Sequence, residues 1–176
     1  LLRDARVPGV PKLLEAGRLP DRTVYLVTEA VPAGSLVSAL ARQQQTGEST
    51  DGLAIEVGQR LARTLARSHA EGVLHLALTP GQVLMAFDEA GPERVYLLGL
   101  GMASLLGRTS GVGWPEEHAM YAAPEQRKPG GTVSGATDVY ALGVLLGQLL
   151  RDRADLKELI ALMQAPDPSE RPTMAD

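Results

Sequence analysis

Residues 75–83 read His-Leu-Ala-Leu-Thr-Pro-Gly-Gln-Val and lie between the clearest helical pattern of the chain and a strand hairpin. Before this stretch, apolar residues recur at near-helical spacing over residues 53–71, which predicts a helix there. Gly72 follows at the position where helices commonly end in the left-handed conformation. After the stretch, two short apolar runs at 82–87 and 94–98 flank turn-forming residues, a pattern typical of a hairpin. Residues 75–83 therefore join a long helix to a pair of strands.

Another hairpin is predicted near the start of the chain. Residues 12–17 alternate weakly between apolar and polar side chains, and residues 23–28 are rich in β-branched ones. Pro20-Asp21 lies between them and favours a turn. Ser35 is a suitable N-cap for a short helix from residue 36 to about residue 43.

The rest of the chain is predicted to hold two loops and two helices. Residues 43–52 are polar, and residues 99–120 show no clear period, so we expect loops at both places. Residues 138–150 are strongly apolar and contain small residues, which indicates a helix buried on most sides. A last helix is predicted over about 156–164.

Composition limits the class of protein. The 176 residues, 44% of them hydrophobic, are enough for one domain with a sizeable core. A net charge of −4 and 3% aromatic residues lead us to expect no nucleic-acid partner. The absence of cysteine excludes disulfides and thiolate metal sites. We find no apolar run of membrane-spanning length and no signal peptide, so we expect a cytoplasmic domain or the cytoplasmic part of a larger protein.

The order of these elements, and a set of short motifs in the same order, resembles the protein kinase family. The motifs that carry the resemblance are a hinge-like strand at 25–31, a catalytic-loop-like stretch at 75–83, Leu-Gly-Leu-Gly at 98–101 where D-F-G belongs, Ala-Pro-Glu at 123–125, Asp138 at the start of a central helix, and Arg171-Pro172. Within the family, the hinge and the Tyr-Ala-Ala-Pro-Glu-Gln segment look most like a bacterial Ser/Thr kinase. Arginine outnumbers lysine 14 to 3, which agrees with a GC-rich bacterial source.

The resemblance implies a mainly α fold with two short β-hairpins, equivalent to a kinase C-lobe with the hinge strands attached. Residues 1–34 would be the end of the C helix, the strand hairpin and the hinge remnant of the N-lobe, and residues 35–176 the helical C-lobe-like domain. The chain starts with Leu1 and not Met, so we expect a fragment, truncated before the Gly-rich loop and the lysine strand of the N-lobe. Residues 150–155 lead almost directly from the buried helix to the last one, so we expect the family's G helix to be deleted.

By the same resemblance, four positions lack the groups that perform phosphoryl transfer. Ala77 stands where a catalytic aspartate orients the substrate hydroxyl, and Thr79 stands where a lysine steadies the γ-phosphate. Gln82 replaces an asparagine that helps to hold a metal ion, and Gly99 replaces the aspartate that holds magnesium. We therefore expect no catalytic residue, no metal site and no cofactor.

Other matching positions have structural roles in the family. Glu125 and Arg171 are expected to form a buried bidentate ion pair. Asp138 is expected to accept backbone N–H groups of the catalytic-loop-like stretch, and His75 to pack against the D-F-G-like region. The resemblance thus implies that the scaffold is kept while the charges for chemistry are absent.

Leu76 and His69 bear on regulation and metal binding. Leu76 replaces the arginine that would receive a phosphorylated activation loop, so the resemblance implies that this switch is absent. His69 is expected to lie on its helix face or beside the C-terminal dipole, because the three histidines show no metal-ligand spacing.

Five positions are candidates for contacts with ligands or partners. Glu29 and Val31 in the hinge, with Thr28 at the gatekeeper position, are where a kinase would contact nucleotide. Thr109 is a candidate phosphorylation site in the long loop, and Trp114 is a candidate anchor for a protein partner.

The expected function is therefore that of a catalytically inactive kinase-like domain, a pseudokinase that serves signalling as a protein-binding or regulatory scaffold. One alternative is residual nucleotide binding or Ser/Thr kinase activity, if an intact N-lobe precedes residue 1. Another is a purely structural remnant within a larger protein. The partner would be a protein, and an exposed hinge strand at 25–31 would favour self-association.

Overall fold

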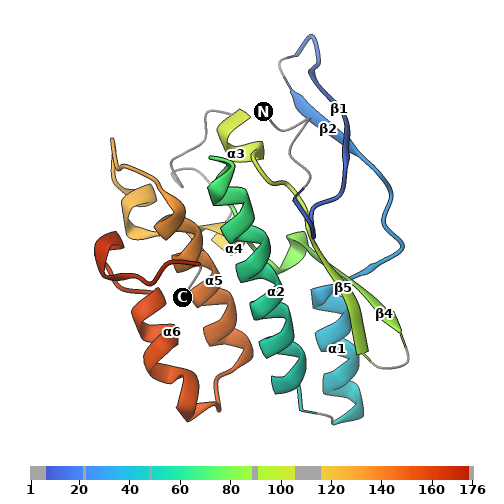
Figure 1. Ribbon diagram of the computed structural model, residues 1–176, viewed down its shortest axis with the longest axis vertical. Coiled ribbons are helices and arrows are strands. Elements are labelled where there is room, and N and C mark those ends of the chain that lie inside the picture. Colours follow the sequence, from blue (N-terminus) through green and yellow to red (C-terminus); the bar gives the residue numbers. More distant parts are fainter. Residues whose placement is uncertain (1–6, 22, 48, 89–90, 106–115, 175–176) are drawn as a thin grey trace.

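The computed structural model describes residues 7–21, 23–47, 49–88, 91–105 and 116–174. A two-stranded hairpin stands beside a helical body (Figure 1). The main helices of the body are α1 (Leu36–Thr46), α2 (Asp51–Ala70), α5 (Gly135–Leu149) and α6 (Lys157–Met163). Helix α2 runs through the middle, with α5 and α6 on one side and α1 and a small sheet on the other (Figure 1).

The hairpin near the start of the chain is confirmed. Strands β1 (Leu13–Arg18) and β2 (Val24–Thr28) pair antiparallel, with Ala16 opposite Leu26. The side chain of Asp21 accepts the backbone N–H of Thr23 and so closes the turn.

Residues 7–11 attach this hairpin to the helical body. The carbonyl oxygen of Gly9 accepts the backbone N–H of Leu97 over 2.7 Å, and the hydroxyl of Thr64 donates to the carbonyl of Pro8. Val7 is buried, so the segment adds apolar contact to these two hydrogen bonds. The end of a C helix expected before the hairpin does not appear in residues 7–12, and residues 1–6 lie outside the described residues.

Helix α1 begins as predicted but ends later. The Ser35 hydroxyl accepts the backbone N–H of Ser38, which makes Ser35 the N-cap. The helix continues to Thr46 because glutamines at 43–45 are good helix formers, and it ends where Gly47 adopts a φ of 73°. Since α2 then begins at Asp51, the predicted loop over 43–52 is wrong at both ends.

The second hairpin is also confirmed, and it gains a strand that the sequence did not predict. Strands β4 (Val83–Asp88) and β5 (Gly91–Leu97) pair antiparallel. A two-residue strand, β3 (Gly34–Ser35), pairs with β4 at its other edge. Two residues are too few to show an alternating pattern, so no periodic signal marked β3.

The core lies where α2 and α5 meet this sheet. Its most deeply buried apolar side chains are Leu36, Val57, Leu61, Leu65, Leu78, Met85, Leu97, Leu142 and Leu145. Burial of each such leucine contributes about 2 kcal/mol. None of the helices in the described part of the chain combines the length and hydropathy of a membrane span.

Short helices replace part of the long loop expected over 99–120. Helices α3 (Met102–Leu105) and α4 (Glu116–Ala119) flank residues 106–115, and 3-10 turns follow, beginning with η2 (Pro124–Arg127). Thr109 and Trp114 lie outside the described residues. Between α5 and α6 the chain forms only the 3-10 turn η3 (Ala154–Leu156), which agrees with the expected deletion of a G helix.

The contact between α5 and α6 depends on a small residue. A Cβ added at Gly143 would lie 2.7 Å from the Met163 Cβ, so we expect Gly143→Ala to force the helices apart. The expected loss is about 1–3 kcal/mol of unfolding free energy, measured by urea denaturation. Gly52→Ala is the control, because no atom beyond its chain neighbours and the backbone of its own helix lies within 4 Å of its Cβ position, and it should be neutral or slightly stabilising. Equal effects of the two substitutions would contradict this packing.

Candidate functional site

The loop at residues 75–79 is held by one carboxylate from another element. Asp138, in the first turn of α5, is fully buried. Its Oδ2 accepts the backbone N–H of His75 over 2.9 Å, and its Oδ1 accepts that of Leu76 over 2.7 Å. A buried carboxylate needs such donors to compensate for its lost hydration. Asp138 therefore fixes the start of the loop, in the role expected from its position.

His75 joins the loop to the segment after β5. Its Nε2 lies 2.9 Å from the carbonyl oxygen of Leu98, so the hydrogen-bond network assigns the proton to this nitrogen. Its Nδ1 then accepts the backbone N–H of Ala77. Burial lowers the pKa of His75, although Asp138 and the Leu98 carbonyl oppose the shift. The imidazole is therefore a neutral structural link next to the Leu-Gly-Leu-Gly segment.

His69 also contacts the buried carboxylate, which the sequence did not predict. Its Nε2 lies 2.8 Å from Oδ2 of Asp138, and because a carboxylate only accepts, the nitrogen donates. The expectation of a helix-face residue is thus incomplete, since the side chain is 18% exposed and faces α5. No local pattern in the sequence marks this contact, because the two residues lie 69 positions apart.

Gln82 and Thr79 are bonded to each other rather than open toward a ligand. The Gln82 Oε1 accepts the backbone N–H of Thr79 over 2.9 Å and lies 3.4 Å from its hydroxyl. This contact caps the 3-10 turn η1 (Pro80–Gln82). The main-chain oxygen of Gln82 accepts the backbone N–H of Leu98, so the turn is tied to the strand that precedes Gly99.

The residues at this place do not fit a magnesium ion. Magnesium requires several oxygen ligands in near-octahedral geometry. The amide oxygen of Gln82 already accepts from Thr79, and Ala77 and Gly99 supply no side-chain oxygen. In the part of the chain that the structure describes, no three His, Asp or Glu side chains are grouped to hold a metal ion.

The hinge positions lie at the end of the first hairpin. Thr28 and Glu29 are exposed, and Val31 is half-buried. The Glu29 carboxylate accepts the backbone N–H of Lys12, and the Glu29 N–H donates to the Lys12 carbonyl. These residues therefore continue the pairing of β1 with β2, and Glu29 uses its side chain within the hairpin.

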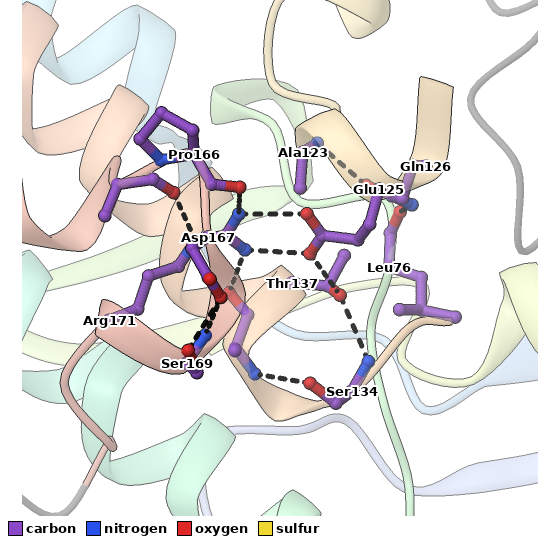
Figure 2. A network of polar contacts seen from close by, with 12 residues as sticks. Leu76, Ala123, Glu125, Gln126, Ser134, Thr137, Pro166, Asp167, Ser169 and Arg171 are labelled. Atoms are coloured by element: carbon purple, nitrogen blue, oxygen red, sulfur yellow. Dashed lines mark hydrogen bonds and ion pairs between the residues drawn. The ribbon is translucent and has the colours of Figure 1, made fainter. Parts of the chain in front are cut away.

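A buried ion pair joins the Ala-Pro-Glu segment to the end of the chain, as Figure 2 shows. The guanidinium of Arg171 donates to both oxygens of Glu125, at 2.8 and 2.9 Å. Arg171 also donates to the carbonyl oxygens of Ala136 and Ala165 and lies 5.0 Å from the ring centre of Tyr140. Arg171 therefore joins the Ala-Pro-Glu segment, the start of α5 and the residues that follow α6.

The surroundings of Glu125 favour its charged form. Burial alone would raise its pKa, but hydrogen bonds from Arg171, from its own backbone and from the Thr137 hydroxyl outweigh burial and lower the pKa. The sequence did not predict the contact of Thr137 with Glu125, because no motif or periodic pattern distinguishes this threonine.

Comparisons with known proteins agree on one family. A family model described as the protein kinase domain matches residues 1–157. Ribosomal protein S6 kinase alpha-2 of Mus musculus is 34% identical over 151 residues, which cover 85% of this chain and 20% of that protein. Ribosomal protein S6 kinase alpha-3 of Homo sapiens is 33% identical over 151 residues, which again cover 85% of this chain and 20% of that protein. The chain thus spans about a fifth of the length of these curated relatives.

Solved structures show the same fold. The PknI kinase domain of Mycobacterium tuberculosis superposes with a TM-score of 0.73 at 20% identity, over 97% of this chain and 69% of that one. At this level of identity the likeness concerns the fold alone.

We expect Glu125→Ala to lower the free energy of unfolding by about 3–5 kcal/mol, because it leaves the Arg171 guanidinium buried without its carboxylate. Chemical denaturation at pH 7 measures this loss. Glu71→Ala is the control, since Glu71 is exposed, and it should change stability by less than about 0.5 kcal/mol. Similar losses in both variants would show that the pair is not buried in solution.

The same pair gives this prediction a pH dependence. A folded-state pKa below the ordinary 4.5 means that the contribution of Glu125 is complete above that pH and is lost as the pH falls through the lowered value. The stability difference between the wild type and Glu125→Gln should therefore shrink on acidification. A difference that grows below pH 4.5 would contradict the lowered pKa.

Proposed function

Because this chain belongs to the protein kinase family, we propose that it is a catalytically inactive member, a pseudokinase that acts as a protein-binding or regulatory scaffold. One observation carries the proposal. The loop at 75–83 is fully held in place by Asp138, His75 and Gln82, yet Ala77 and Gly99 offer no carboxylate beside it.

Kinase chemistry requires the groups that are missing here. Phosphoryl transfer depends on a residue that orients the attacking hydroxyl and on metal ions that neutralise the phosphates. Ala77 has no acceptor, Thr79 has no positive charge, and Gln82 is already hydrogen-bonded to Thr79. The absence of base and metal ligand together supports a role other than catalysis.

Nucleotide binding, or kinase activity together with an N-lobe before residue 1, is the second candidate. The hinge hairpin favours it, since β1 and β2 are formed, β2 ends at Thr28, and residues 29–31 follow it directly. In that case the lysine contact to the phosphates would come from the N-lobe, whereas Gly99 supplies no metal ligand for them.

We expect no transfer of radiolabelled phosphate from ATP to Ser/Thr peptides, and no magnesium-dependent thermal shift with ATP. The reason is that Ala77 and Gly99 carry no carboxylate. The assay should include the Gln82→Leu variant, which removes the one amide at the site. Transfer that persists through purification and is lost in Gln82→Leu would establish the kinase alternative. A thermal shift with ATP that needs no magnesium would support nucleotide binding without catalysis.

The proposed scaffold role includes self-association through the hinge hairpin. Leu14 and Val27, on adjacent strands, are 51% and 43% exposed. Among the described residues the hairpin forms a sheet of two strands only, and β2 carries no charge along Val24–Thr28. An uncharged outer edge with exposed apolar side chains favours pairing with another strand.

Light scattering at rising concentration of the 176-residue chain should therefore show a growing apparent mass. Val27→Lys places a charge on the hairpin and should suppress the growth. Val37→Lys is the control, because Val37 is 52% exposed but lies on α1. A constant monomer mass, or equal suppression by both substitutions, would contradict self-association at the hairpin.

A further inference from the structure

Leu76 occupies an unusual backbone conformation in the core. Among the described residues it is the one non-glycine residue with a positive φ, at 64°. Its side chain is 3% exposed. A branched residue in the left-handed region is strained, so the surrounding structure must hold it there.

Two side chains from other segments hold the two backbone groups of Leu76. Asp138 accepts its N–H over 2.7 Å, and Nε2 of Gln126 donates to its carbonyl oxygen over 2.8 Å. These partners lie 62 and 50 residues away in sequence. Asp138 belongs to α5 and Gln126 to the turn η2, and Figure 2 shows Gln126 directed at Leu76.

The amide of Gln126 is engaged at both ends. While its nitrogen donates to Leu76, its Oε1 accepts the backbone N–H of Ala123 over 3.1 Å. The side chain is 2% exposed, so water cannot easily replace either partner. Rotation or removal of this one amide would leave a buried N–H and a buried C=O without partners, which is costly.

We propose that Gln126 is a latch that joins segment 121–127 to loop 75–79, so that the two open and close as one cooperative unit. The latch needs no phosphate, because it consists of a neutral amide and two backbone groups. The apolar Leu76 side chain, buried beside it, offers no charge for a phosphorylated residue. This inference concerns conformation and holds whether or not the chain catalyses phosphoryl transfer.

Native-state hydrogen exchange on the wild-type chain tests the latch directly. The amides of Leu76 and Ala123 are the reporters, since each donates to one of the bonds described above. As a denaturant is added below the unfolding transition, their protection factors should converge and stay within about threefold of each other. Separate openings with different denaturant slopes would overturn the proposal, and this measurement requires no substitution.

A substitution with a matched control gives a second test. Gln126→Leu keeps the side-chain volume similar and removes both bonds, so the Leu76 and Ala123 amides should each exchange at least about tenfold faster. The α2 amides around Leu61 should be unchanged. Gln164→Leu is the control: the Gln164 side-chain amide donates to the Gly143 carbonyl of α5, outside both segments, so exchange at Leu76 should stay as in the wild type. Faster exchange at Ala123 alone in Gln126→Leu would show that no latch exists.

A separate experiment tests whether the latch forms without phosphate. Chain treated with a protein phosphatase should keep the protection of Leu76 and Ala123 within about threefold of the untreated chain. A tenfold or larger loss of protection on treatment would show that a phosphorylated residue holds the two segments together.

Discussion

The buried carboxylate of Asp138 is the constraint on which the rest of the site depends. It lies in the first turn of α5, without exposure to water, and accepts the backbone N–H groups of His75 and Leu76 as well as the Nε2–H of His69. A buried carboxylate is stable only if its oxygens accept hydrogen bonds that replace its lost hydration. The loop therefore cannot move away from α5 without leaving a charge unsatisfied, and this fixes the place of everything that follows it, including η1 and β4.

The constraint explains how the loop at 75–79 can be ordered with alanine at residue 77 and glycine at residue 99. Backbone groups, and not catalytic side chains, make the contacts that position the loop: the N–H groups bonded to Asp138, the Leu98 carbonyl bonded to His75, and the Thr79 N–H bonded to Gln82. None of these bonds requires a particular side chain at residue 77 or 99. Alanine and glycine at these two positions are therefore compatible with an ordered loop, and this is why the proposed scaffold role and the observed order do not conflict.

The sequence predicted the elements well and the contacts between them less well. The helix over 53–71 was found within two residues, because apolar side chains recur along α2 and Gly72 stands in the left-handed conformation after it. Ser35 was identified as an N-cap from its chemistry alone. By contrast, His69 and Asp138 form a contact although they lie 69 positions apart. Gln126 belongs to a turn without periodicity, and its partner Leu76 lies 50 positions away. Local propensity carries no information about such partners, whereas the likeness to a family supplied Asp138, Glu125 and Arg171.

The buried charged side chains of this chain contribute more to the geometry of the structure than to its stability. A buried ion pair such as Glu125–Arg171 loses hydration on both sides, and well-packed apolar residues of similar size often give equal or greater stability. Apolar residues cannot contact five carbonyl and carboxylate oxygens in fixed directions, as Arg171 does with the Ala-Pro-Glu segment, α5 and the carbonyls of residues 165 and 166. Asp138 does the same for the loop at 75–79. A protein that presents a defined surface to a partner needs such directional contacts as much as an enzyme does, so these contacts are compatible with the proposed scaffold role.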